Sequence, residues 1–184
     1  MIRKSFIILI GILLLSQQIL VAEDAALSIT PRNNRDDLLL YINATSAFDE
    51  KTKTAILSGV PTTFIFYIKM DRARNYWFNK NIVKLKITHV IKYDNLKKEF
   101  HIDRSWDSSS PIVTSSFEEA QQLMINIDSL KIIALREMEK GKHYQIRTKA
   151  ELSKFTLPLH LHRVLFFLEF LDVETDWYAI DFTF

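Results

Sequence analysis

The stretch Val83-Lys84-Leu85-Lys86-Ile87-Thr88-His89-Val90-Ile91-Lys92-Tyr93 decides the fold, because apolar and polar side chains alternate along nearly all of it. Successive side chains of a β-strand point to opposite faces, so this alternation places an apolar row on one face and a largely cationic row on the other. The polar exception on the apolar side is His89. The stretch is therefore predicted to form a long strand with one face on the core and the other in solvent.

The same period recurs on both sides of this stretch. Over residues 64–70 both faces are largely apolar, which predicts a central strand covered on its two sides. Further alternating runs cover residues 99–103 and 144–152. Turn-forming residues separate these runs at 93–97 and again at 139–142, and each of the two segments is predicted to be a hairpin loop. Successive hairpins predict an antiparallel sheet.

Two segments have the pattern of short amphipathic helices. Ser116 followed by Glu119 is a capping-box pair, and apolar residues then recur at helical spacing as far as Ile127. The other helix is predicted from about residue 49 to 57, with Gly59 placed to end it. Both helices are expected to pack on the sheet.

These patterns predict a mainly β fold, an antiparallel β-sandwich or strongly curved sheet with two or three short helices. Residues 23–184 are expected to form one domain, since no linker, low-complexity tract or internal repeat divides them. Over residues 159–171 the apolar side chains fit both the helical spacing and the two-residue spacing of a strand. The sequence therefore does not decide between helix and strand for that segment.

Residues 1–22 have the three-part order of a secretory signal peptide. Arg3 and Lys4 precede an apolar run over residues 6–15, and the small Ala22 offers a cleavage point before the first acidic residue. The alternative is a retained membrane anchor. A spanning helix needs about 20 apolar residues, however, and two glutamines interrupt the apolar run. We therefore expect cleavage and an exported protein of the periplasm or cell envelope.

Charge and cysteine content narrow the function classes. Arg3 and Lys4 account for the whole excess of 24 basic over 22 acidic residues, so residues 23–184 are neutral. A neutral domain lacks the basic footprint of nucleic-acid binding, and export argues further against such a partner. With 0 cysteines the chain has no disulfide framework, thiol nucleophile, zinc–cysteine site or lipid-modified N-terminal cysteine. No nucleic-acid partner and no cofactor are predicted.

Several short motifs follow one another across most of the chain beyond residue 22. They are Gly59-Val60-Pro61, Arg72 with Arg74 and Trp77, Tyr93-Asp94, Phe117-Glu118-Glu119-Ala120 and Leu157-Pro158-Leu159. Their order and spacing resemble an uncharacterised bacterial envelope family, domain of unknown function 4390. The resemblance implies an exported protein without an assigned activity, whose gene in some bacteria lies beside that of a membrane sensor kinase. It supplies no catalytic residues.

Two groups of polar residues have types suited to chemistry. Glu99, His101 and Asp103 share one strand face and could orient a proton-transfer group, although a solvated strand face is the simpler interpretation. His160 and His162 could reach one metal ion if the backbone there is extended, but the sequence offers no clear third ligand. We therefore predict no catalytic residue and no enzyme activity, and these two histidines are only weak metal candidates.

Arg and aromatic side chains are most concentrated at Arg72, Arg74, Tyr76, Trp77 and Phe78, where a loop is expected to follow a strand. Such side chains contribute much contact energy each, so this segment is a candidate binding surface for a protein, a peptide or an envelope glycan. The structural alternative is that Trp77 and Phe78 turn inward and cap the core while the arginines stay solvated.

The sequence favours a non-enzymatic binding or assembly module of the cell envelope, accessory to a membrane protein such as a sensor kinase. An alternative is a carrier of an apolar envelope ligand, with the phenylalanines of residues 158–170 lining a pocket. A distant alternative is a small outer-membrane β-barrel, suggested by the alternation from Trp177 to the terminal Phe184 and opposed by the two amphipathic helices. Once the signal peptide is cleaved, the domain is expected to contact a membrane at most, without spanning it.

Overall fold

The computed structural model describes residues 27–45, 50–74, 78–109, 111–153 and 174–184. The elements in chain order are β1 (Leu27–Asn33), β2 (Asp37–Ala44), α2 (Glu50–Leu57), β3 (Thr62–Arg72), β4 (Lys80–Asp94), β5 (Glu99–Arg104), β6 (Ile112–Thr114), α3 (Phe117–Ile125), β7 (Asn126–Ala134), the 3-10 helix η1 (Leu135–Glu137), β8 (His143–Leu152) and β9 (Tyr178–Thr183). The alternating stretch of residues 83–93 lies within β4, as predicted.

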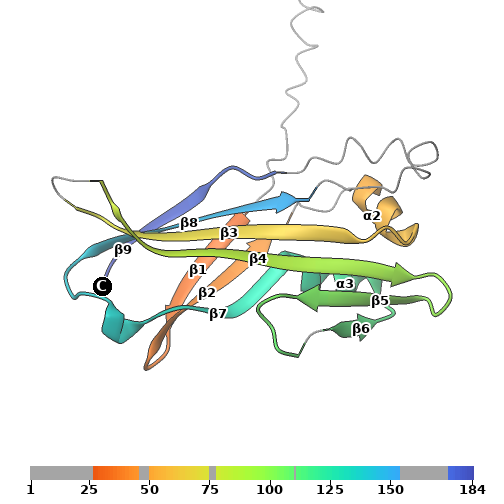
Figure 1. The fold of residues 1–184 in the computed structure, drawn as a ribbon, viewed down its shortest axis with the longest axis horizontal. Helices are drawn as coiled ribbons and strands as arrows, with labels where there is room; N and C mark the ends of the chain where they lie inside the picture. Colours follow the sequence, from red (N-terminus) through yellow and green to blue (C-terminus); the bar gives the residue numbers. More distant parts are fainter. Residues whose placement is uncertain (1–26, 46–49, 75–77, 110, 154–173) are drawn as a thin grey trace, which may run out of the picture.

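Two antiparallel sheets carry the fold. The smaller sheet has the strand order β1-β2-β7, and the larger one has the order β6-β5-β4-β3-β8-β9. In Figure 1 the smaller sheet passes behind the larger one, and buried apolar side chains from both sheets pack into one core. The prediction of a mainly β fold with antiparallel sheets and short helices is confirmed.

Strand β3 is central in the larger sheet, with β4 on one side and β8 on the other. Its inner row is at most 1% exposed and consists of Phe64, Phe66, Ile68 and Met70. On the outer face Ile65 is buried and Tyr67 is half-buried. The predicted cover on both faces is therefore complete on the inner side and partial on the outer side.

Both predicted helices form. The Ser116 hydroxyl accepts a hydrogen bond from the backbone N–H of Glu119 at 3.2 Å, so Ser116 is the N-cap of α3 as predicted, while the Glu119 carboxylate accepts from the Thr114 hydroxyl instead of the Ser116 N–H. The prediction that Ile127 continues this helix is wrong. The backbone becomes extended after Ile125 and enters β7, where pairing with β2 satisfies its hydrogen bonds. Helix α2 is followed by Gly59, whose φ of +81° is the left-handed conformation that glycine favours.

Residues 139–142 do not close a hairpin, contrary to the prediction. Strand β7 pairs with β2 in the smaller sheet, whereas β8 pairs with β3 and β9 in the larger one, so the segment carries the chain from one sheet to the other. The hairpin predicted at residues 93–97 does form between β4 and β5. There the Asp94 carboxylate accepts hydrogen bonds from the backbone N–H groups of Leu96 and Lys97 at 2.9 and 3.1 Å.

Strands β1 and β2 have no counterpart in the sequence prediction. In β2 the buried residues Leu38, Leu40 and Ile42 show no clear alternation in the sequence, because Leu39 and Tyr41 between them are also apolar. The predicted signal peptide and the undecided segment 159–171 lie outside the described residues. Neither helix in the described part of the chain has the length and apolar character needed to cross a membrane.

Candidate functional site

An open pocket lies at one end of the larger sheet, where β3 ends and β8 begins. Arg72 is registered with Tyr144, and the backbone N–H of Ala73 donates to the carbonyl oxygen of His143 at 2.9 Å. The pocket has a volume of about 510 Å³, and we call it the basic pocket. It is lined by Arg72, Ala73, Arg74, Glu139, Gly141, Lys142 and His143.

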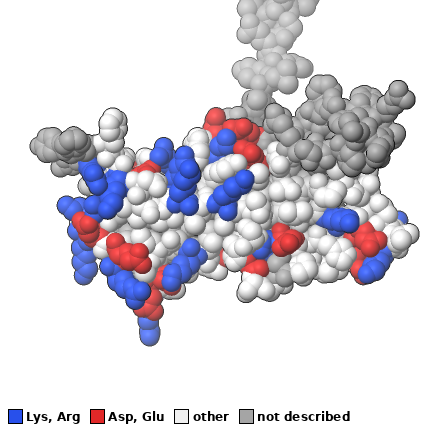
Figure 2. All heavy atoms as spheres, viewed as in Figure 1, with Lys and Arg blue, Asp and Glu red and all other residues white. Residues whose placement is uncertain are grey.

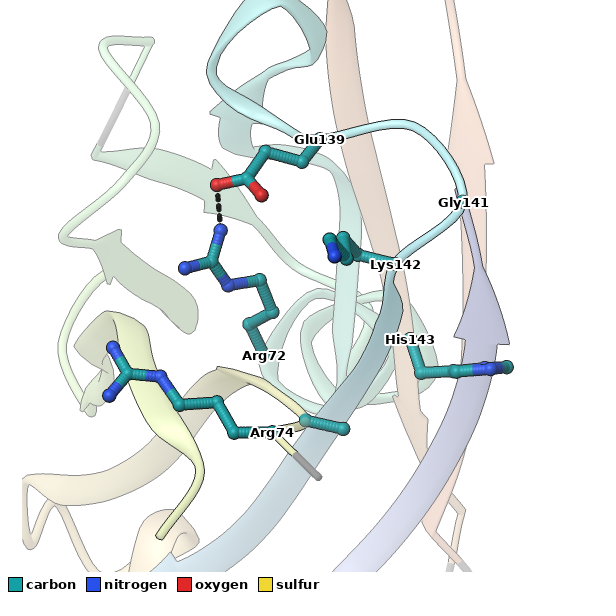
Figure 3. A pocket seen from close by; sticks show the side chains of 7 residues that line it. Arg72, Arg74, Glu139, Gly141, Lys142 and His143 are labelled. Carbon is teal, nitrogen blue, oxygen red and sulfur yellow. Dashed lines mark hydrogen bonds and ion pairs between the residues drawn. The ribbon is translucent and has the colours of Figure 1, made fainter. Parts of the chain in front are cut away.

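Positive charge in the basic pocket exceeds negative charge. The Arg72 guanidinium forms an ion pair with the Glu139 carboxylate, and these side chains are 19% and 56% exposed. Arg74 and Lys142 form no ion pair with any carboxylate in the described ranges. Figure 3 shows Arg72 and Arg74 reaching toward the same side of the pocket, whereas the His143 ring points away from them. That ring lies 2.8 Å from the Thr183 hydroxyl, measured from Nδ1.

Cations in this arrangement suit an anionic ligand. A guanidinium group can donate two parallel hydrogen bonds to one carboxylate or phosphate, and these charge-assisted bonds are stronger than neutral ones. Arg74 is exposed, so its donors face solvent at the mouth of the pocket. The pocket therefore has the chemistry to hold an acidic group that a partner presents.

Phe78 lies just before β4, at the same end of the sheet, and is 95% exposed. The structural alternative, in which this ring turns inward to cap the core, is wrong for Phe78. The structure thus brings Arg72 and Arg74 together in the basic pocket and places an exposed aromatic ring at the same end. Tyr76 and Trp77, predicted for the same surface, lie outside the described residues.

The sequence prediction missed Glu139 and Lys142 as members of this site. They belong to the segment between the two sheets, and the pairing of β3 with β8 brings that segment to the end of β3. The charges of residues 139–142 were visible in the sequence, but no local pattern connects them with Arg72.

His89, the polar exception on the inner face of β4, belongs to a closed cluster. Its ring is fully buried, with Nδ1 2.9 Å from the carbonyl oxygen of Met124 and Nε2 2.8 Å from the indole nitrogen of Trp106. The indole N–H can only donate, so Nε2 accepts and Nδ1 carries the proton that is donated to Met124. Burial lowers the pKa of His89 from 6.5 to about 4, which keeps the ring neutral. The cluster is structural.

The polar residues predicted as candidates on β5 belong neither to the basic pocket nor to the His89 cluster. Glu99, His101 and Asp103 lie on β5 opposite Asp94, Lys92 and Val90 of β4, on the outer face. The described residues contain no group of three side chains placed to hold a metal ion. His160 and His162 lie outside the described residues, as does the segment predicted to line a carrier pocket.

The family model described as "Domain of unknown function (DUF4390)" matches residues 25–181, most of the chain. No curated protein and no solved structure matches the chain.

Proposed function

The chain belongs to the family described as domain of unknown function (DUF4390), and on that premise we propose that it is an exported, non-enzymatic binding module of the cell envelope. Its partner in this proposal is a membrane protein, such as a sensor kinase, that presents an acidic segment to the basic pocket. Export is supported by Arg3 and Lys4 ahead of an apolar run, and the sensor kinase by the family resemblance.

The observation that carries the proposal is the basic pocket itself. Arg74 and Lys142 line it without an ion pair to any carboxylate among the described residues, while Glu139 is already engaged by Arg72. An acidic side chain entering the pocket would find donors ready to bind it. Its carboxylate would meet both Arg74 and Arg72, which reach toward the same side in Figure 3.

Phe78 supports a partner of protein type. A nearly fully exposed phenylalanine at the same end of the sheet as two arginines combines residue types that are enriched at protein interfaces. An acidic segment with an apolar side chain beside its carboxylate would cover both Phe78 and the basic pocket.

The test is photocrosslinking in living cells. A photoreactive amino acid replaces Phe78 in one strain and Leu96 in another, because these apolar side chains are 95% and 94% exposed at opposite ends of β4. Strand β4 has 15 residues, so the two positions lie about 50 Å apart. The proposal expects one discrete membrane protein attached at position 78 and not at position 96.

A charge variant completes the experiment. Arg74→Glu in the position-78 strain should abolish the crosslink while leaving the amount of folded protein unchanged, since Arg74 is exposed and unpaired among the described residues. Arg32→Glu, an exposed arginine of β1, is the matched control and should keep the crosslink. Equal crosslinking from positions 78 and 96, or a crosslink insensitive to Arg74→Glu, would contradict the proposal.

A further inference from the structure

The outer face of the larger sheet carries cations directly beside one another. Lys69 of β3 is registered with Lys84 of β4 on one side and with Arg147 of β8 on the other. Lys86 lies two positions along from Lys84, on the same face. Side chains opposite one another on adjacent strands are about 5 Å apart at Cβ, and like charges there destabilise the sheet. We refer to Lys69, Lys84 and Lys86 as the lysine cluster.

Among the residues that the structure describes, ion pairs with carboxylates lie on the β8 side of this basic region. Arg147 donates to the Asp71 carboxylate at 2.6 Å, and Lys149 forms an ion pair with Glu174. The lysine cluster forms no ion pair with a carboxylate in the described part of the chain. In Figure 2 basic side chains stand over the middle of this face, and acidic side chains lie at its upper margin and again in its lower part. Among the described residues, the lysine cluster is thus the part of this face without a neutralising carboxylate, while Asp94, Glu99 and Asp103 lie farther along the same face on β4 and β5.

Aromatic side chains lie among these cations. The Lys69 ammonium is 4.6 Å from the ring centroid of Trp177, which is 42% exposed. Tyr67 lies on β3 between Lys86 and β8, with the Lys86 ammonium 5.8 Å from its ring centroid. Lysines beside the amphipathic rings of Trp and Tyr are typical of protein surfaces at the headgroup region of a membrane.

We propose that the region of this outer face around the lysine cluster lies on a membrane surface containing anionic phospholipids, with the lysine cluster against the lipid phosphates and Trp177 at headgroup level. The cations are spread over two strands of an open sheet face rather than gathered in a cleft. A bilayer, which presents anionic groups across a plane, complements this distribution. The proposal is independent of the proposed function, because the basic pocket lies at the end of the sheet.

The test follows the chemical accessibility of individual lysines in the protein isolated from the cell envelope. The protein is mixed with vesicles of phosphatidylcholine alone, or of phosphatidylcholine with phosphatidylglycerol, and lysine acetylation is measured by mass spectrometry. Lys84 and Lys86 should be protected severalfold by the anionic vesicles alone, and added salt should remove the protection. Lys97 and Lys98, in the turn after β4, should stay equally accessible on both vesicles. Acetylation of Lys84 and Lys86 reports directly on whether the outer face is covered. It does so regardless of which segment of the protein first contacts the vesicle.

Charge reversal gives the second arm. Lys84→Glu with Lys86→Glu should lower binding to the anionic vesicles at least about tenfold. Arg32→Glu with Arg35→Glu makes the same charge change at the β1–β2 hairpin of the smaller sheet and should bind like the wild type. Circular dichroism checks that both variants are folded. Equal acetylation of Lys84 and Lys86 on the two kinds of vesicle would overturn the proposal, even if an acidic protein were later found on this face. Unchanged binding by the Lys84/Lys86 variant would overturn it too.

Discussion

His89 and Arg72 both project from the larger sheet toward the side that holds the core, but the chain encloses only His89. That ring is fully buried and has partners at both nitrogens, whereas Arg72 shares an open pocket with Glu139. Water cannot replace a lost partner at His89, but it can at Arg72. Polar side chains on one sheet face thus divide into a structural cluster and a candidate binding site according to whether the fold encloses them.

The largest effect is expected from removing the enclosed ring. His89→Ala leaves the buried Met124 carbonyl and the part-buried Trp106 indole N–H without their partner and opens a cavity between β4 and α3. The free energy of unfolding should fall by about 4 kcal/mol, measured by urea denaturation. A loss below about 1 kcal/mol would mean that water reaches the site, and the contrast with Arg72 would then disappear.

The next effect is a dependence on pH. The pKa of His89 is about 4 in the folded protein against 6.5 for an ordinary histidine, so between these values the unfolded chain binds a proton that the folded protein does not. Stability present above pH 6.5 should therefore be lost as the pH falls toward 4, by about 3 kcal/mol in total. Arg104 lowers the pKa of the ring further, while the hydrogen bond to Met124 and the Asp107 carboxylate oppose the shift.

An NMR titration of the His89 ring checks this prediction directly. It separates His89 from the carboxylates that also titrate in acid. A midpoint near 6.5 for His89 would show that the ring is not enclosed in solution.

A smaller effect should follow from removing a single hydrogen bond of the cluster. Trp106→Phe keeps an aromatic ring but leaves Nε2 of His89 without its donor, and the free energy of unfolding should fall by about 2 kcal/mol. Trp177→Phe is the matched control, because this ring is partly exposed on the outer face, and it should change stability by no more than about 0.5 kcal/mol. Equal losses in the two variants would argue against a special role for the indole N–H of Trp106.

The smallest effect on stability is expected at the basic pocket. Arg72→Ala breaks an ion pair with the largely exposed Glu139 carboxylate and should cost about 0.5 kcal/mol. The same variant should weaken the crosslink from position 78, because the pocket loses one of its arginines. A loss above about 2 kcal/mol would place Arg72 with His89 among the structural residues.

Local patterns predicted the elements that one segment specifies alone. The alternation in β4, the N-cap at Ser116 and the glycine after α2 each depend on a few neighbouring residues, and all three predictions are confirmed. The error at residues 139–142 arose because sequence proximity suggests a hairpin, whereas β7 and β8 find their partners in different sheets.

The candidate site was predictable only in part for the same reason. Arg72 and Arg74 stood out by composition, and Phe78 with them. Glu139 and Lys142 could not be connected with them, because the pairing of β3 with β8 is specified by the whole fold. His89 stood out as a polar residue in an apolar row, but its partners come from a turn and a helix far along the chain.

The pairing of β3 with β8 also bears on when the chain can fold. It joins Phe64 to Leu152 and Arg72 to Tyr144, and the smaller sheet similarly needs β7 to reach back to β2. Forming contacts between residues this distant in sequence has a large entropic cost of loop closure. Such contacts therefore form more slowly than those of local hairpins. We expect both sheets to be completed only after most of the polypeptide has been synthesised. A nascent chain of this topology would stay unfolded for longer, and passage across a membrane before folding requires an unfolded chain.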